Sequence, residues 1–385
     1  MGTQAHICFF GLMNLPVLAP EFEEHGIGGE QVQHTLLGKA LVRKGYQVSM
    51  VVGDYLQPDG AAWSSIRTYK AFRPDEGIPM VRFVYPRWTK IWAALKRADA
   101  DIYYASSAGM HVGLIALFCR KYSRKLVYRV AHDNDCSPDA VRLLVKYGRD
   151  RFLYRLGLQR ADAILAQSVQ QQESLRDQYG VDSDLASMLV TEPAAEPRPG
   201  HQRDIDVLWV NNLRQFKRPD RLLELARALP HLSFHMVGGE EEGHGALYEE
   251  TRRQANGLSN LTFHGRMPYS RVQAFYERAK VFVNTSDSEG FPNSFLQAWV
   301  RATPVISFFD PDRIIACHDL GSVPATTAQM ASAIETLARN ELKREAVGQR
   351  CREYMRLYYN NDLTLALYRS IFDRLAQARR QAIAA

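Results

Sequence analysis

Short apolar runs alternate with stretches of helical period along the chain. Residues 6–11, "HICFFG", and 47–53, "QVSMVVG", are apolar runs of the length of buried strands. The region between them repeats apolar residues every three to four positions, as an amphipathic helix does, at Val32, Leu36, Leu37, Ala40 and Leu41. Gly45 follows this region, where a glycine commonly ends a helix. We therefore predict a strand–helix–strand unit of a parallel sheet.

The second half of the chain repeats this arrangement. Apolar runs at 206–210 and 232–239 predict strands, and the stretch between them has helical period, with one apolar face formed by Leu222, Leu225, Ala226 and Leu229. The repetition predicts an α/β fold of two Rossmann-like domains. Because ligands of open α/β sheets bind beyond the carboxyl ends of the strands, we expect the two domains to face across a cleft that holds the site. The expected boundaries are an N-terminal domain at 1–190, a proline-rich linker at 191–204, a C-terminal domain at 205–355, and a helix at 356–385 that crosses back to the N-terminal domain.

Composition and charge narrow the class of protein. The 385 residues carry a formal net charge of +6, a modest excess that suits an anionic ligand or surface and is too small to indicate nucleic acid. The five cysteines are scattered without a C-x-x-C pair, which argues for a reducing compartment and against a zinc site or a disulfide framework. No apolar run reaches the roughly 18–20 residues of a membrane span, and the first residues lack a basic stretch. We expect a cytoplasmic protein without a signal peptide.

A glutamate, a glycine and a new helix follow the apolar strand "AKVFVNTSD" (279–287). We expect Glu289 to bind sugar hydroxyls, and Gln297, a turn inside the helix, to reach ribose hydroxyls of the same ligand. The turn and helix start between them suit a diphosphate, at Gly290, Phe291, Pro292, Asn293 and Ser294. A nucleotide-sugar carries its groups in this order. The alternative is a capped helix with an exposed acid.

Two further loops carry groups suited to phosphate. Lys217 precedes a helix in "NNLRQFKRPD" (211–220), where its charge could meet a diphosphate with help from Arg214 or Arg218. The loop "HGIGGE" (25–30) contains Gly28 and Gly29, which allow the backbone to approach a ligand closely ahead of a helix. The alternatives are a solvated basic turn and a flexible loop without a ligand.

A histidine and two carboxylates end the strand in "LVYRVAHDNDCSP" (126–138). Polar groups at the carboxyl end of a strand are well placed for a site, and we assign His132 a hydrogen-bonding role. The spacing of His132, Asp133, Asp135 and Cys136 matches no metal-ligand set, so no metal is expected. A histidine satisfied within the core is the alternative.

Together these stretches resemble the retaining glycosyltransferases of the GT-B fold, the large group 1 or family 4 type that carries E-x(7)-E. "EGFPNSFLQAWVRATPVIS" (289–307) resembles that motif, and three other family segments are similar to 26–52, 151–180 and 210–226. The resemblance covers nearly the whole chain and is more specific in the carboxyl half. Two positions depart from the family. Gln297 replaces the second glutamate, and Asn212 stands in Asn211–Asn212–Leu213 where G-R-L would supply a phosphate-binding arginine.

The resemblance implies a hexosyltransferase that moves a sugar from a nucleotide-sugar, with uridine as the default base, and retains the anomeric configuration without a metal or other cofactor. The acceptor would be a glycan or lipid-linked glycan in cell-surface polysaccharide synthesis. Lys217, Glu289 and His132 would act in catalysis. The donor would be bound by Asn212, Arg214, Gln297 and the glycine and helix-start residues named above. Two other classes stay open: a nucleotide-sugar epimerase on the same fold, and a non-catalytic nucleotide-sugar-binding scaffold.

Basic residues and tryptophans are interleaved in the N-terminal half. Residues 82–97 contain Arg82, Arg87, Trp88, Lys90, Trp92, Lys96 and Arg97, and residues 120–129 add five basic residues. Tryptophan favours the water–lipid boundary and basic residues favour an anionic leaflet. We expect peripheral attachment to the inner face of the membrane. The alternative is two solvated helix faces with core tryptophans.

Overall fold

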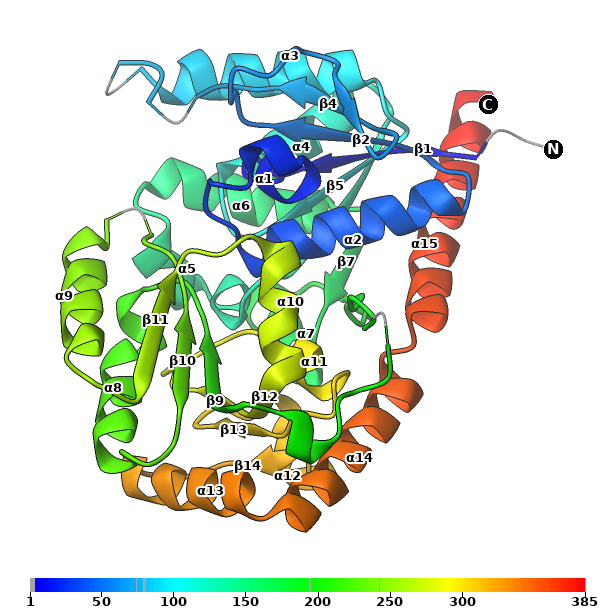
Figure 1. Ribbon diagram of the computed structural model, residues 1–385. Coiled ribbons are helices and arrows are strands. Elements are labelled where there is room, and N and C mark those ends of the chain that lie inside the picture. Colours follow the sequence, from blue (N-terminus) through cyan, green and yellow to red (C-terminus); the bar gives the residue numbers. More distant parts are fainter. Residues whose placement is uncertain (1–3, 74, 79–80, 194, 242, 385) are drawn as a thin grey trace. The chain divides into compact units, whose positions relative to one another are not determined.

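The computed structural model describes residues 4–73, 75–78, 81–193, 195–241 and 243–384. The chain forms two compact units. Unit 1 comprises Met1–Phe22, Gly29–Leu189 and Asn361–Ala385, and unit 2 comprises Glu23–Gly28 and Val190–Asn360. Each unit is built around its own, mainly parallel sheet (Figure 1).

Unit 1 contains a sheet of strand order β3-β4-β2-β1-β5-β6-β7-β8. The pairings are parallel except between β3 and β4. The strands are β1 (His6–Phe10), β2 (Gln47–Val52), β3 (Ala62–Trp63), β4 (Ile66–Lys70), β5 (Ile102–Ser106), β6 (Lys125–Arg129), β7 (Ala163–Ala166) and β8 (Asp184–Leu185). The helices are α1 (Leu15–Leu18), α2 (Gly29–Arg43), α3 (Thr89–Ala98), α4 (Met110–Lys121), α5 (Pro138–Leu144), α6 (Gly148–Arg160), α7 (Val169–Tyr179) and α15 (Asn361–Ala384).

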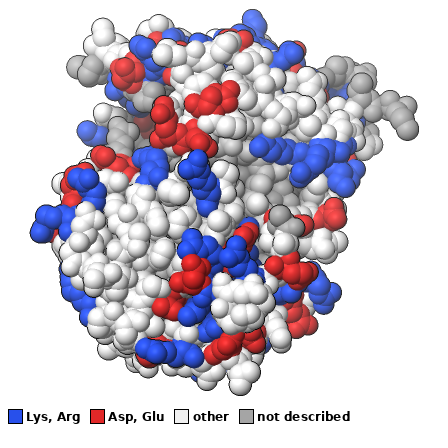
Figure 2. Space-filling view, in the orientation of Figure 1, with Lys and Arg blue, Asp and Glu red and all other residues white. Residues whose placement is uncertain are grey.

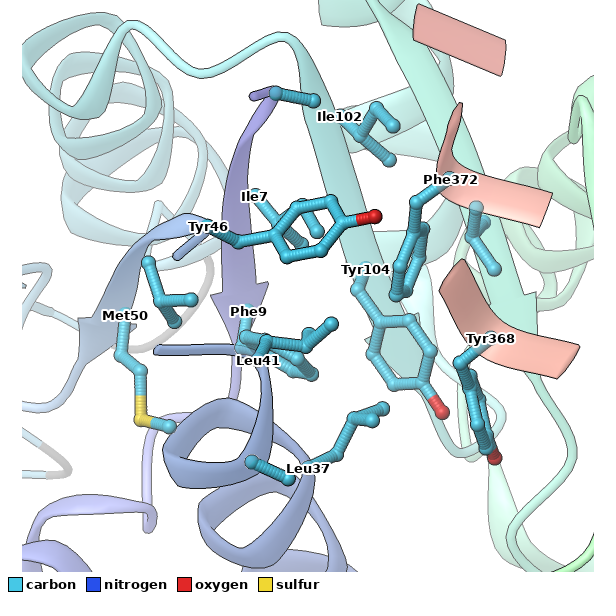
Figure 3. Packing of buried hydrophobic residues seen from close by; sticks show 14 of the residues in the cluster. Ile7, Phe9, Leu37, Leu41, Tyr46, Met50, Ile102, Tyr104, Tyr368 and Phe372 are labelled. Carbon is cyan, nitrogen blue, oxygen red and sulfur yellow. The ribbon is translucent and has the colours of Figure 1, made fainter. Parts of the chain in front are cut away.

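The β1 strand separates two hydrophobic cores because its successive side chains point to opposite faces. Ile7 and Phe9 pack with residues of α2 and α15, whereas Cys8 and Phe10 pack with residues of α3 and α4. Figure 3 shows the first of these cores, in which α15 covers the sheet with Tyr368 and Phe372 beside Tyr104 of β5. The C-terminal helix is therefore part of unit 1.

A hydrogen-bonded glycine turn joins α2 to β2. Gly45 has φ +90°, a conformation that side chains disfavour. Its N–H donates to the carbonyl of Val42 over 2.9 Å, and the N–H of Tyr46 donates to the carbonyl of Leu41 over 3.1 Å. These two bonds satisfy carbonyls that the helix end leaves unpaired. The predicted end of this helix is confirmed.

Unit 2 contains a sheet of strand order β11-β10-β9-β12-β13-β14, and all of its pairings are parallel. The strands are β9 (Ile205–Val210), β10 (Phe234–Val237), β11 (Leu261–Gly265), β12 (Ala279–Asn284), β13 (Val305–Ser307) and β14 (Gly321–Ser322). The helices are α8 (Pro219–Ala228), α9 (Gly245–Asn256), α10 (Tyr269–Arg278), α11 (Asn293–Trp299), α12 (Ile314–His318), α13 (Thr327–Arg339) and α14 (Glu341–Tyr358).

Chain order in unit 2 reverses at the centre of its sheet. From β9 the chain builds β10 and β11 on one side and then returns to build β12, β13 and β14 on the other. In open α/β sheets, ligands bind at the carboxyl ends of the two strands that flank such a reversal, here β9 and β12. The predicted class, two Rossmann-like parallel-sheet domains, is confirmed. Four loops therefore matter most for function, those after β9 and β12 in unit 2 and those after β1 and β5 in unit 1.

Candidate functional site

The loops that follow β9 and β12 bring Lys217 and Glu289 together. Lys217 ends a 3₁₀ turn (Gln215–Lys217) before α8, and Glu289 lies between β12 and α11. The Lys217 Nζ lies 2.5 Å from both carboxylate oxygens of Glu289. Their side chains are only 14% and 9% exposed. Two residues assigned to different parts of one ligand thus form a buried ion pair.

Neighbouring side chains complete the hydrogen bonding of the Glu289 carboxylate. The Ser286 hydroxyl donates to its Oε1 over 2.7 Å, and the Asn284 amide donates to the same oxygen over 3.2 Å. Burial alone would raise the pKa of Glu289, but the Lys217 ammonium and these hydrogen bonds hold the pKa below its usual value. Glu289 is therefore ionised at neutral pH.

The Lys217 loop is also fixed through its backbone. The Thr285 hydroxyl donates to the carbonyl of Lys217 over 2.8 Å and accepts from the indole N–H of Trp209 over 2.9 Å. Residues 284–286, which fix Lys217 and Glu289, are not among the site residues predicted from sequence. A signal existed, since three polar residues directly follow an apolar strand, at the end where sites form.

Gln297 lies within α11 and contacts a buried arginine. The guanidinium of Arg301, one turn later, donates over 3.1 Å to the side-chain oxygen of Gln297 and over 3.2 Å to its carbonyl. Both side chains are almost fully buried. Because the Gln297 oxygen accepts from Arg301, the amide nitrogen is the end of Gln297 that can donate to a ligand.

The basic residues around Lys217 all have acidic partners. Arg214 pairs with Glu241, Arg218 pairs with Asp220 and Asp287, and Arg221 pairs with Asp287. Figure 2 shows a similar mixture on the visible face, where Lys and Arg side chains lie next to Asp and Glu. A diphosphate would therefore have to share or exchange these partners.

Other predicted donor residues occupy the same unit. The Asn212 amide donates over 2.8 Å to the carbonyl of Ile27, so the segment that ends at Gly28 lies at the carboxyl end of β9. Gly290, Phe291 and Pro292 are buried, and Asn293 and Ser294 begin α11 half-buried.

The remaining predicted residues, His132 and Gly29, belong to unit 1. His132 precedes a 3₁₀ turn (Asp133–Cys136), and its Nδ1 accepts from the N–H of Asn134 over 3.1 Å. That bond leaves Nε2 to carry the proton of the neutral ring. The Asp135 carboxylate accepts from three backbone N–H groups, of Ala108, Ala131 and His132.

The loop chemistry around His132 does not resemble a metal site. Gln171 donates over 2.8 Å to Asp133, and burial raises the pKa of the Cys136 thiol, which keeps it protonated. Among the residues that the structure describes, no group of three or more His, Cys, Asp or Glu side chains could hold a metal ion.

Gly29 begins α2, and a second polar cluster missed by sequence analysis lies directly behind it. Glu30 accepts from the Ser107 hydroxyl, and His34 lies 3.1 Å from Asn14 and 2.8 Å from Ser106. Burial raises the pKa of Glu30 to about 7 and lowers that of His34 to about 3. The start of α2 thus carries its own titratable acid.

Two family models match the chain. One, described as "Glycosyl transferases group 1", matches residues 193–354, and one described as "Glycosyltransferase Family 4" matches residues 27–188. The chain belongs to the group 1 glycosyltransferases. The first of these models covers the Lys217–Glu289 pair.

Individual relatives and solved structures are similar to this chain at low identity or over a short stretch. The O-antigen biosynthesis glycosyltransferase WbnH of Escherichia coli is 34% identical over 107 residues, which are 27% of this chain and 29% of WbnH. The match therefore spans less than a third of that relative's length.

A sucrose-phosphate synthase from Thermosynechococcus elongatus superposes with a TM-score of 0.73 at 20% identity, over 99% of this chain and 100% of the other. The HepE protein of Anabaena, solved with UDP and glucose, has a TM-score of 0.71 at 14% identity, over 96% and 100%. These two structures share the fold.

Proposed function

We propose that the protein transfers a sugar from a nucleotide-sugar donor, with retention of anomeric configuration, to a glycan or lipid-linked acceptor of a cell-surface polysaccharide. The buried Lys217–Glu289 pair between the β9 and β12 strand ends carries this proposal. The role of the relative WbnH in O-antigen biosynthesis supports the class of acceptor. UDP bound to HepE supports uridine as the base.

Lys217 has the capacity to serve the leaving diphosphate while it stays paired. An ammonium group has three N–H donors, and the two oxygens of Glu289 engage two of them. The third can donate to a phosphoryl oxygen as negative charge builds there in the transition state. Glu289 then acts as the group that holds the ammonium in place, and a metal is not needed for this charge. The diphosphate oxygen could take the acceptor's proton on the same face of the sugar.

The carboxylate of Glu289 can also bind the sugar. Its Oε1 accepts from Lys217, Ser286 and Asn284, whereas Oε2 accepts from Lys217. A carboxylate offers about four lone-pair sites, so Oε2 keeps capacity for a sugar hydroxyl. Gln297 would donate its amide to a ribose oxygen, where the family's glutamate would accept from the hydroxyls. The roles of His132, Gly28 and Gly29 stay predictions.

A panel of nucleotide-sugars tests the proposal in two stages. Thermal shift identifies the donor, because a ligand at 100 times its Kd adds about 2.7 kcal/mol to stability. Release of nucleoside diphosphate is then measured with and without lipid-linked glycan acceptors. Release that requires an acceptor supports the transferase. Conversion of donor without acceptor indicates the epimerase, and binding without any conversion indicates the scaffold.

Two variants separate the assigned binding roles. Glu289→Ala should weaken binding of the nucleotide-sugar more than binding of the bare nucleoside diphosphate, because it removes a ligand of the sugar as well as the partner that orients Lys217. Gln297→Ala should weaken both, and Glu249→Ala, which changes an exposed glutamate of α9, should affect neither. Calorimetry with each ligand measures the difference. Equal losses for both ligands in Glu289→Ala would refute a sugar-binding role for this carboxylate.

A further inference from the structure

Unit 1 exposes two apolar segments outside the site described above. The first consists of Ile78 and residues 81–85, which lead into a π-helical turn (Phe83–Trp88). The second consists of residues 143–152, which join the end of α5 to the start of α6. Eight large hydrophobic side chains in them are 46% to 87% exposed: Ile78, Val81, Val84, Tyr85, Leu143, Leu144, Tyr147 and Phe152. Single exposed hydrophobic residues are ordinary, but a group of this size marks an interaction surface.

The two segments meet at Arg149. Its guanidinium carbon lies 4.2 Å from the ring centroid of Phe83 in the first segment and 4.8 Å from that of Tyr147 in the second. The arginine thus bridges two aromatic rings that belong to sequence regions more than sixty residues apart. We call the combined area, formed by Ile78 and residues 81–85 and 143–152, the apolar–basic surface.

Positive charge is concentrated in the sequence stretches that contain this surface. Residues 73–97 and 137–152 together hold ten basic and four acidic residues, and this excess equals the formal net charge of +6 of the whole chain. The remaining residues are therefore neutral in sum. Three of the four acids pair with basic residues of the same stretches, Asp75 with Arg73, Glu76 with Lys90 and Asp150 with Arg149. Arg142 and Lys146, which flank the two exposed leucines, are themselves exposed.

The residues expected from sequence to face a membrane differ from those that the structure exposes. The rings of Trp88 and Trp92 stack with centroids 6.4 Å apart, are partly buried and pack against a core cluster of unit 1. In the second basic stretch, Arg124 pairs with Asp99 and Lys125 pairs with Asp162, and Arg129 is buried. Among the described residues, no helix has the length and apolar composition required to cross a membrane.

We propose that the apolar–basic surface docks the protein onto an anionic lipid bilayer. Exposed aliphatic side chains can enter the boundary between headgroups and acyl chains, tyrosine favours that boundary, and the basic side chains around them face lipid phosphates. The excess of positive charge selects this occupant over a second copy of the chain, whose identical surface would repel it. The proposal is independent of sugar transfer, because it uses none of the residues assigned to the donor.

Flotation with vesicles tests the docking. Vesicles of phosphatidylcholine alone are compared with vesicles that also contain phosphatidylglycerol, at low and high salt. We expect binding only with phosphatidylglycerol and a loss of binding at high salt. Arg142→Gln/Lys146→Gln should weaken binding about thirtyfold, because each basic residue near an anionic leaflet contributes about fivefold. Leu143→Gln/Leu144→Gln should weaken it at least about tenfold through lost apolar contact.

The matched control is Leu342→Gln/Lys343→Gln, which changes an exposed leucine and its neighbouring lysine on α14 and should leave binding unchanged. Melting curves and the nucleotide thermal shift of every variant confirm that the fold and the donor site are intact. Failure of the wild type to float with phosphatidylglycerol overturns the proposal, as do surface variants that float like the control. A dimer that dissociates in the surface variants would assign the surface to a second copy and also overturn it. A wild type that floats with phosphatidylglycerol but binds no nucleotide would support the docking and count against the proposed function.

Discussion

Replacing Lys217 by methionine should create a pH-dependent defect in the stability of unit 2. Methionine keeps much of the volume of the lysine stem and removes only the charge. The variant leaves the carboxylate of Glu289, whose side chain is 9% exposed, without its ammonium partner. Removing one partner of a buried ion pair typically costs about 3–5 kcal/mol. Ser286 and Asn284 still donate to Glu289, so the lower end, about 3 kcal/mol, is expected near pH 7.5.

The direction of the pH effect follows from the pKa of Glu289 in each protein. In the wild type this pKa is held below its usual value near 4.5, so its stabilising contribution is lost only as the pH falls further. In Lys217→Met the burial remains without the ammonium, and the pKa of Glu289 should rise above its unfolded value. Stability in the variant is then lost as the pH increases through that raised pKa. The gap between the two proteins should therefore narrow between about pH 7.5 and about pH 5.

Scanning calorimetry at the two pH values measures this gap. For a unit of this size, about 3 kcal/mol corresponds to a Tm difference of about 6–12 °C near pH 7.5. The transition of unit 2 is identified in the wild type by its shift with a nucleoside diphosphate. Lys217→Met/Glu289→Gln should recover most of the loss, because it removes both charges together. A deficit that is the same at both pH values, or a double variant no more stable than Lys217→Met, would show that no buried ion pair is broken.

Three further predictions concern other parts of the molecule. Glu241→Gln releases Arg214 from its ion pair and should tighten UDP binding roughly two- to fivefold by calorimetry; unchanged affinity would show that Arg214 does not meet the diphosphate. Burial raises the pKa of Glu30 to about 7, so the contribution of Glu30 to stability is lost as the pH rises from its usual pKa near 4.5 toward 7. Glu30→Gln should flatten the plot of Tm against pH over this range, and a plot like that of the wild type would contradict the raised pKa. Gly113→Ala would place its Cβ 2.1 Å from a backbone oxygen of α6 and should destabilise unit 1 by about 1–3 kcal/mol in a denaturant titration, whereas Gly148→Ala, with 3.6 Å to a flexible side chain, should be nearly neutral; equal effects would refute the close helix contact.

Local periodicity predicts the elements of this fold because each strand and helix buries one apolar face. The helix with Leu222, Leu225, Ala226 and Leu229 on one side was predicted at 221–230, and α8 occupies Pro219–Ala228 with those leucines and alanine buried. The end of α2 at Gly45 was likewise readable, since the required backbone conformation favours glycine. Periodicity predicts whether an individual aromatic side chain is buried less well than it predicts the helices and strands. The basic residues around Trp88 and Trp92 in sequence favour membrane-facing tryptophans, with core tryptophans as the alternative, and the structure shows rings that are partly buried against the core.

The sequence predicts Lys217 and Glu289 as separate site residues, but it does not predict that they form a pair. Lys217 and Glu289 are 72 residues apart, and they meet only because the chain returns past β9 to place β12 beside it. Local pattern contains no information on strand order, so each residue was assigned its own part of the ligand. The pairing changes the electrostatics, because an ion pair has no net charge and every basic residue around it is also matched by an acid. A nucleoside diphosphate therefore brings negative charge into a neutral site. Under the proposed function, its binding draws on donors beyond the ion pair, the third N–H of Lys217 and an Arg214 that leaves Glu241, so these two residues are the ones to vary.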